Sequence, residues 1–490
     1  MKLPNIEGCT NEKETIDALV DAAIVKEANI NPTDEGSERT TPFEPLDKTS
    51  TREIKLELRK FKNKKAPGPD QIRADALKLG GEVFLEAFKP IADYVLSTGY
   101  FPKRWKLGEC IFLHKSGKDH KQASSYRPIT LLNIMGKLCE RLILSRLRGT
   151  VNKMKPPFQH GFTRFRGTAT QILRTGKIIM DALAFGESVS MICTDLSKAF
   201  DSINHKGLIK KLQNADAPNN VKEIIENYLK DRSLKGRFRT MNGEEKKISH
   251  VVPQGSILGP VIFNLYVYDI WDHHDRIRGL KLSQYADDLC ILNRAENPDH
   301  ATMRAEWAAE TIVNYYDRWG LKCNVEKTEC IMFTKKRKFK PTVKIKDEIL
   351  PYKKEIKYLG VIFDKVLKMN PHTNRVVKNL KQVRGALGPI IGFYAKTDLE
   401  VKLAIIQACI LPIMDYGAVQ LLSRYSNSNL QKIERQYRMA LKSAGQFPRR
   451  LNTETLWEIS DLEAWHLRAA DLNHKMLEKI AALKIEDLET

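Results

Sequence analysis

Two apolar segments carry three aspartates, one at the end of the first segment and two in the middle of the second. Residues 188–195 (SVSMICTD) end in Asp195, and residues 280–292 (LKLSQYADDLCIL) are apolar on both sides of Asp287 and Asp288, which predicts a hairpin with this pair at its tip. Carboxylates that converge at neighbouring strand ends repel one another unless a cation joins them. Oxygen ligands favour magnesium, and two such ions would clamp the attacking and leaving oxygens of a phosphoryl transfer. Taken alone, Tyr-x-Asp-Asp is equally compatible with an ordinary polar turn.

A second candidate is the segment at residues 251–260 (VVPQGSILGP), which precedes an apolar helix predicted over residues 261–270. Gln254 and Gly255 stand at its centre, and glycine lets a backbone approach a ligand closely. The same pattern is typical of a plain strand-to-helix turn. Both interpretations stay open from this segment alone.

The elements around these residues predict an α+β fold, with short strands and helices mixed over residues 188–363. Asp201 and Ser202 are predicted to cap the helix that follows the strand of Asp195. Beyond residue 364 the pattern is helical almost throughout. Upstream, the apolar spacing predicts a strand over residues 110–114 and helices over residues 72–79, 83–96 and 131–147.

The two ends of the chain differ in charge. Residues 1–50 hold more acidic than basic side chains, and residues 31–50 are rich in Thr, Pro, Glu and Ser, which predicts an acidic leader or linker that packs loosely. Residues 365–396 carry Lys and Arg but no acidic residue. This helical run is either a solvated face or a track for a polyanion.

Composition narrows the class of protein. The 490 residues suffice for about two to four packed units, and 42% hydrophobic residues indicate a globular chain. No apolar stretch approaches the roughly 18 residues that a membrane helix needs, and no secretory signal is visible. A net charge of +21 favours phosphate backbones as partners. Eight cysteines without a CxxC pair predict reduced, packed thiols in an intracellular protein.

Further segments occur along the chain in order with these two candidates. They are residues 65–70 (KAPGPD), 113–119 (LHKSGKD), 125–132 (SYRPITLL), 158–162 (FQHGF), 319–327 (WGLKCNVEK) and 356–363 (IKYLGVIF). Together with the aspartate and glycine segments, they resemble the reverse transcriptase family, and within it the LINE-type enzymes of non-LTR retrotransposons. The resemblance runs from about residue 51 to residue 363 and extends partly into the helical C-terminal region.

This resemblance implies a catalytic centre. Asp195, Asp287 and Asp288 would hold two Mg²⁺ ions, with Mn²⁺ as an alternative, and Asp288 would be the least critical of the three. Lys327 would protonate the leaving pyrophosphate, although a lysine there is also compatible with a solvated surface residue.

The resemblance also implies residues that bind substrates. Lys115 and Arg127 would bind the incoming triphosphate, although this chain has His114 and Ser116 beside Lys115, where the family often has proline. Phe200 would lie beneath the sugar and exclude a 2′-hydroxyl, and the alternative for this ring is ordinary core. The other implied contacts are Gln254 and Gly255 for the nucleotide and templating base, and Tyr358, Leu359 and Gly360 for the primer grip.

Residues 158–162 match the stretch that contacts the template in this family. Aromatic side chains in such a stretch either stack on bases or fill the core. We predict that Phe162 packs in the core, and both roles stay open for Phe158.

As a whole, the resemblance implies a right-hand polymerase that extends a DNA primer with dNTPs on an RNA template and forms an RNA–DNA hybrid. It would serve target-primed retrotransposition in the nucleus, with no membrane partner and with an endonuclease supplied from outside the chain. The expected parts are an acidic leader (1–50), fingers with an N-terminal extension (51–187), a palm with inserted connecting elements and the primer grip (188–364), and a helical thumb with a C-terminal extension (365–490).

Two alternatives compete with this interpretation. An RNA-dependent RNA polymerase shares a palm with paired aspartates, but that class usually has a small or polar residue where Phe200 stands and a glycine where Ala286 stands. A domesticated, inactive RNA-binding module of the same fold is opposed by the joint retention of the aspartates, Gln254 and Arg127.

Overall fold

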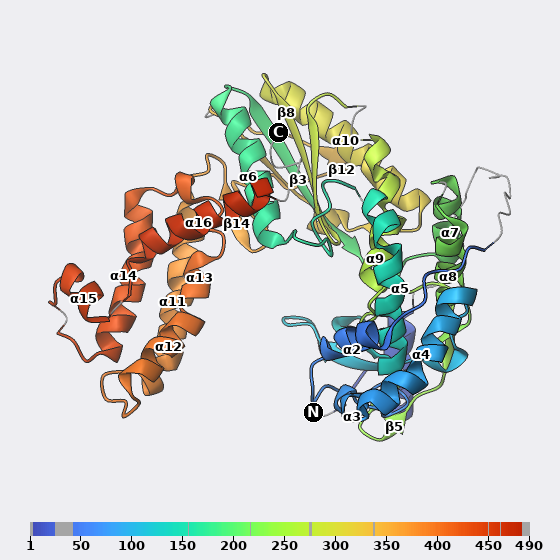
Figure 1. The fold of residues 1–490 in the computed structure, drawn as a ribbon. Coiled ribbons are helices and arrows are strands. Elements are labelled where there is room, and N and C mark those ends of the chain that lie inside the picture. The colour runs from blue at the N-terminus through green and yellow to red at the C-terminus, as the bar shows by residue number, and fades with distance from the viewer. Residues whose placement is uncertain are drawn as a thin grey trace. The chain divides into compact units, whose positions relative to one another are not determined.

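The computed structural model describes residues 3–24, 43–154, 156–215, 217–273, 277–336, 339–448, 450–460 and 462–482. The chain divides into two compact units, each built from separate stretches (Figure 1). Unit 1 comprises Met1–Pro156, Leu196–Asp272 and Ile312–Cys323, and unit 2 comprises Pro157–Asp195, His273–Thr311 and Asn324–Thr490. The predicted boundaries of fingers, palm and thumb do not coincide with these units and stay predictions.

Unit 1 is built around the antiparallel hairpin of β1 (Leu107–His114) and β2 (Tyr126–Leu131). β1 pairs in parallel with β4 (Arg232–Phe238), and β4 pairs in turn with β5 (Met241–Asn242) and β6 (Lys246–Ile248). The predicted strand over residues 110–114 is therefore confirmed as part of β1.

The helices of unit 1 include the three that were predicted upstream. Predicted helix 131–147 is α5 (Ile134–Lys153), which begins later than predicted because Leu131 is the last residue of β2. The other helices and strands of unit 1 are α1 (Glu12–Ala23), α2 (Thr51–Arg59), α3 (Ala74–Leu79), α4 (Gly81–Thr98), α7 (His205–Asn214), α8 (Asn219–Leu229), α9 (Gly259–Tyr266) and β9 (Lys322–Cys323).

The predicted acidic leader packs against unit 1 at both of its described ends. α1 buries Ile16, Leu19 and Val20, and it lies so close to β4 that a Cβ on Gly236 would stand 2.3 Å from the Ile16 side chain. This close packing leaves residues 12–23 no freedom to act as a loose linker. Residues 25–42 of the leader lie outside the described residues.

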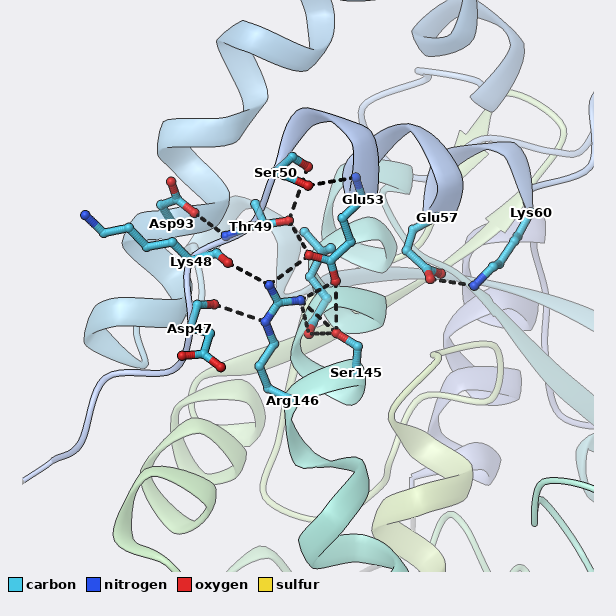
Figure 2. Close-up of polar contacts among 11 residues, drawn as sticks. Asp47, Lys48, Thr49, Ser50, Glu53, Glu57, Lys60, Asp93, Ser145 and Arg146 are labelled. Atoms are coloured by element: carbon cyan, nitrogen blue, oxygen red, sulfur yellow. Dashed lines mark hydrogen bonds and ion pairs between the residues drawn. The ribbon is translucent and has the colours of Figure 1, made fainter.

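At the other end of the leader, Arg146 of α5 hydrogen-bonds to the backbone (Figure 2). Its guanidinium donates to the carbonyl oxygens of Asp47 at 3.0 Å and Lys48 at 2.9 Å and pairs with the Glu53 carboxylate of α2. A mostly buried guanidinium needs acceptors for its donors, and these backbone oxygens supply them. The loose packing predicted for residues 31–50 is therefore wrong for residues 43–50.

Unit 2 contains a sheet in the order β10–β3–β8–β7, formed by β3 (Ser188–Ser197), β7 (Leu280–Tyr285), β8 (Asp288–Ala295) and β10 (Glu329–Phe333). The last two residues of β3 belong to unit 1 and pair with β9. α6 (Thr168–Ala184) packs on β7, and α10 (Pro298–Arg318) runs from unit 2 into unit 1. The hairpin predicted around Asp287 is confirmed.

One apolar core joins this sheet to the C-terminal helices of unit 2. It includes Val189 and Leu292 of the sheet, Phe363 of a short hairpin, and Leu380 and Tyr437 of two helices. The remaining elements are β11 (Lys344–Ile345), β12 (Glu348–Ile349), β13 (Glu355–Tyr358), β14 (Val361–Asp364), α11 (Asn370–Ile391), α12 (Leu399–Cys409), α13 (Leu411–Asp415), α14 (Asn427–Ala444), α15 (Thr453–Ser460) and α16 (Trp465–Ala482). The helical pattern predicted beyond residue 364 is confirmed.

Two further expectations concern the chain as a whole. Within the described ranges, no helix combines the length and apolar character needed to cross a membrane. All eight cysteines are free thiols. Six of them are buried or only partly exposed within strands and helices, whereas Cys409 of the helix at residues 399–409 is exposed. The prediction of unpaired thiols is therefore confirmed.

Candidate active site

The sheet of unit 2 places two of the three aspartates directly opposite each other. Asp195 near the end of β3 pairs across the antiparallel ladder with Asp288, the first residue of β8, so both side chains lie on one face. Asp288 also pairs with Tyr285 of β7, which leaves Ala286 and Asp287 as the turn. Pairing therefore joins Asp195 to Asp288, the aspartate that was predicted to be the least critical of the three.

The three carboxylates lie within electrostatic range of one another. Burial, together with the negative charges of Asp287 and Asp195, raises the pKa of Asp288 to about 6. Hard carboxylate oxygens held this close fit a divalent cation, which would turn their mutual repulsion into attraction. Within the described part of the chain, no group of three or more His, Cys, Asp or Glu side chains is already arranged as a metal site. The metal ligands stay a prediction.

Lys327 lies beside the same carboxylates. Its Nζ is 3.4 Å from Oδ2 of Asp195, and the side chain is 60% exposed. A short 3-10 turn positions it, because the backbone amide of Asn324 donates to the Asp195 carbonyl at 3.0 Å and the Asn324 side chain accepts from the Lys327 amide. The lysine is therefore an accessible cation that faces Asp195, which suits either a proton donor or a countercharge.

The hairpin predicted as the primer grip lines the same hollow. A pocket of about 140 Å³ is bounded by Asp195, Asp288, Lys327, Tyr358 and Leu359, among others. Leu359 and Gly360 form the turn between β13 and β14 with φ of +45° and +80°. The Leu359 carbonyl accepts a 2.6 Å hydrogen bond from the Tyr416 hydroxyl, which anchors this turn to the C-terminal helical region.

The Tyr358 side chain is buried in the core of unit 2. It is 3% exposed, and its hydroxyl donates to the Ser283 carbonyl at 3.2 Å and accepts from Gln171 at 3.3 Å. A buried phenol with both hydrogen-bonding roles used is a packing element. Of the three residues predicted for the primer grip, Leu359 and Gly360 are the two at the turn.

The FQHGF segment packs differently from the prediction. Phe158 is fully buried, whereas Phe162 is 50% exposed and has a φ of +59°. The prediction that Phe162 packs in the core is therefore wrong, because the left-handed backbone at this residue turns its ring outward to solvent. Of the two roles left open for Phe158, core packing is the one observed.

The predicted nucleotide-binding residues of unit 1 gather around a buried carboxylate. Gln254 donates through Nε2 to both Asp201 oxygens, at 3.1 and 3.2 Å. Burial raises the pKa of Asp201 to about 6, which the neighbouring Lys198 and Lys115 partly oppose. Asp201 was predicted to cap a helix with Ser202, and that prediction is wrong. The helix is α7, which begins four residues later, and the Asn204 side chain caps it.

Backbone contacts hold the other residues of this cluster. The Gln254 carbonyl accepts from the Thr130 amide at 2.8 Å, and Gly255 has a φ of +131° and leaves no room for a Cβ, which would stand 2.5 Å from the Thr130 carbonyl. The Phe200 carbonyl accepts from Val252, and its half-buried ring lies 5.2 Å from that of Phe263. The Phe200 ring therefore packs against Phe263 and remains partly exposed.

The lysine and arginine that were predicted to bind the triphosphate lie on the β1–β2 hairpin. Arg127 is exposed and pairs with Leu113 in the ladder. Lys115 follows β1, and its Nζ donates to the Ser124 carbonyl at 2.8 Å. Unit 1 thus brings Lys115 near Asp201 and Gln254, while Arg127 projects from the neighbouring strand.

A residue that the sequence interpretation missed supports the loop of Gln254. Glu140 of α5 is 1% exposed, and its Oε2 accepts from the amides of Ile257 at 2.5 Å and Leu258 at 3.0 Å. Burial raises its pKa, which Arg232, the two amides and Lys137 oppose. A glutamate in the middle of an apolar helix pattern was the available signal, since such residues are rarely buried without a partner.

Most of the basic run predicted as helical over residues 365–396 forms α11, whereas residues 365–369 and 392–396 lie outside the helix. Lys378 and Lys381 are exposed on this helix, and Arg384 donates to the Gln436 side chain of α14 at 3.0 Å. A role as a track for nucleic acid stays a prediction.

Comparison with known proteins matches residues 114–363 to the family described as reverse transcriptase (RNA-dependent DNA polymerase). The chain is 28% identical over 445 residues to the RNA-directed DNA polymerase from mobile element jockey of Drosophila melanogaster, covering 89% of this chain and 47% of that protein. It is 30% identical over 420 residues to the probable RNA-directed DNA polymerase from transposon BS of the same fly, covering 84% and 46%.

The chain thus spans about half the length of the curated relatives it matches. Among solved structures, apo telomerase from Candida Tropicalis aligns with 84% of this chain and 74% of that chain, at 12% identity and a TM-score of 0.40. That score is too low to establish a shared fold.

Proposed function

Because the chain belongs to the reverse transcriptase family, and its relatives are polymerases of non-LTR mobile elements, we propose that it extends a DNA primer with dNTPs on an RNA template. The observation that carries this proposal is the facing pair of Asp195 and Asp288, with Asp287 close enough to raise the pKa of Asp288 and with Lys327 beside Asp195. We further propose that the reaction serves target-primed retrotransposition in the nucleus, with strand cleavage by an endonuclease from outside these residues.

Asp195, Asp287 and Asp288 would hold two divalent ions, Mg²⁺ or Mn²⁺. When bound, such ions activate the primer hydroxyl and stabilise charge on the leaving pyrophosphate. Lys327 would give a proton to the pyrophosphate, a role supported by its ammonium group, which lies beside Asp195 and is accessible to solvent. Leu359 and Gly360 would contact the primer from the edge of this pocket.

The unit 1 cluster would bind the nucleotide. The exposed guanidinium of Arg127 suits two-point contact with phosphate, and Lys115 adds a positive point charge. Gln254 would contact the nucleotide through its backbone or through an amide that Asp201 orients. The Phe200 ring would lie beneath the sugar. Since catalysis of phosphoryl transfer is mostly positioning and charge stabilisation, no covalent nucleophile is needed.

The test is primer extension on poly(rA)/oligo(dT) with magnesium. Asp287→Asn should lower the extension rate about 10³-fold or more, because it removes a charge that the transition state needs, while primer–template affinity stays within about twofold. Asp347→Asn is the matched control, since Asp347 is an exposed aspartate of unit 2 at a positive φ that asparagine tolerates. Full activity of Asp287→Asn would refute the metal assignment. Primer–template binding without extension by the unmodified chain would favour the inactive RNA-binding module.

A further inference from the structure

The turn between β7 and β8 is hydrogen-bonded from behind by buried side-chain amides, and Gln159 is the one that bonds both backbone groups of Ala286. Gln159 is fully buried, and its Oε1 accepts from the backbone amide of Ala286 at 3.0 Å while its Nε2 donates to the Ala286 carbonyl at 3.3 Å. Oε1 also accepts from the Gly161 amide at 2.8 Å. Two backbone donors therefore face one atom of the side chain, which identifies that atom as the oxygen.

This turn is a place where the backbone needs support. Ala286 has a φ of +56°, a left-handed conformation that costs energy for any residue with a Cβ. The hairpin ladder stops at the Tyr285 and Asp288 pair, so strand pairing does not hold Ala286 or Asp287. The Ala286 carbonyl also accepts from the Gln284 side chain at 3.1 Å, whereas the side-chain acceptor of the Ala286 amide is Gln159. Gln159 thus bonds both backbone groups of Ala286 and stabilises the strained residue that immediately precedes Asp287.

The segment around Gln159 runs alongside the end of β7. The Gln284 amide donates to the Phe158 carbonyl at 3.0 Å, and the His160 amide donates to the Gln284 carbonyl at 2.9 Å. A Cβ on Gly161 would stand 2.3 Å from the Ala286 amide nitrogen and 3.0 Å from its Cα. The backbone of the FQHGF segment therefore packs directly on the turn, and glycine at residue 161 is what permits this approach.

We propose that Gln159 is a positioning residue for polymerisation, which holds the turn of Asp287 and Asp288 in its reactive geometry through the backbone of Ala286. This inference rests on the proposed function and assigns to the FQHGF segment a role distinct from template contact. A primary amide suits the task because it supplies an acceptor and a donor without charge. A glutamate would lose the donor and bring a fourth carboxylate to the hairpin.

The test compares Gln159→Met with Asn293→Leu. Methionine keeps the length of the side chain but makes none of its three hydrogen bonds. Asn293 is an equally buried amide on β8 that lies away from the turn and donates to the Arg278 carbonyl. In Gln159→Met, kcat should fall about 10- to 100-fold, as expected when a reacting group is displaced by about 1 Å. KM for dNTP and primer–template affinity should stay within about twofold of the unmodified protein. Asn293→Leu should retain the unmodified kcat.

Hydrogen exchange supplies a readout that does not depend on turnover. Without metal or substrate, a peptide spanning residues 284–289 should exchange faster in Gln159→Met, because the Ala286 amide has lost its acceptor. Peptides from α6 should be unchanged. Gly161→Ala is the second variant, which keeps the amide but displaces the turn sterically, and it should lower kcat as well.

The outcomes separate this inference from the proposed function. If the unmodified protein extends the primer and Gln159→Met matches its kcat, Gln159 does not position the turn. If the unmodified protein does not extend the primer at all, the proposed function fails, and the exchange of the 284–289 peptide still decides whether Gln159 holds Ala286. Unchanged exchange there would overturn the inference.

Discussion

The turn before Asp287 in unit 2 and the loop after Gln254 in unit 1 are each held by a buried side chain that binds backbone amides, but the two side chains differ in charge. Gln159 is a neutral amide that contacts Ala286, whereas Glu140 is a carboxylate that accepts from Ile257 and Leu258. Both are almost fully buried, so solvent access does not explain the difference.

The surrounding charges explain it. The turn of Ala286 lies among three aspartates, so a glutamate in place of Gln159 would add repulsion inside the protein. The loop of Ile257 lies near Arg232 and Lys137, whose charges favour an ionised Glu140. Both side chains therefore accept from backbone amides, but the neutral Gln159 stands near negative charges and the acidic Glu140 stands near positive charges.

The largest loss of stability should come from replacing Glu140, the buried carboxylate that accepts hydrogen bonds from the unit 1 loop. Glu140→Leu leaves the amides of Ile257 and Leu258 buried without an acceptor, which should lower the free energy of unfolding by about 2–5 kcal/mol. Glu140→Gln keeps an acceptor oxygen and should lose less. Chemical denaturation of both variants measures the difference, and equal losses would mean that the amides of the loop do not depend on the acceptor.

A smaller effect should follow from the buried carboxylate that binds Gln254. The pKa of Asp201 in the folded state is about 6, above its ordinary value of 3.8, so the protonated form favours folding. This contribution is fully present below about pH 4 and is lost as pH rises through about 6, at a cost of at most about 3 kcal/mol. Asp201→Asn should therefore gain stability relative to the unmodified protein between pH 4 and pH 8.

Thermal unfolding without nucleotide at several pH values measures this difference. The asparagine keeps an oxygen that accepts from Gln254, so the loop should retain its position. A difference in melting temperature between the two proteins that is constant from pH 4 to pH 8 would show that Asp201 does not titrate in this range, and the charge argument for unit 1 would weaken.

The smallest effect concerns Phe200, whose partly buried ring packs on Phe263. If the ring lies beneath the sugar, Phe200→Val should raise kcat/KM for CTP relative to dCTP at least about tenfold, which corresponds to about 1.4 kcal/mol. Most of the activity with dCTP should remain. Phe263→Leu is the control for lost ring packing, and an equal change in sugar preference there would assign the effect to packing.

Much of the fold was predictable because its signals are local. The apolar runs before Asp195 and around Asp287 and Asp288 predicted β3 and the β7–β8 hairpin, and apolar spacing predicted α3, α4 and α5. The prediction failed where a residue or segment was compatible with two structural roles. Asp201 was interpreted as a helix cap, and the packed residues 43–50 were interpreted as part of a loose leader. Composition cannot distinguish such residues, because their role depends on partners that are distant in the sequence.

The sequence by itself determined which residue types stand at the strand ends and turns, and hence the family and the carboxylate chemistry. Only the tertiary structure decided that Asp288 is the cross-strand partner of Asp195, that Tyr358 is buried and Phe162 exposed, and that Gln159 and Glu140 support the two loops. The physical reason is range. Periodicity and turn propensity act over a few residues, whereas these hydrogen bonds join residues more than a hundred positions apart and form only once the core has packed.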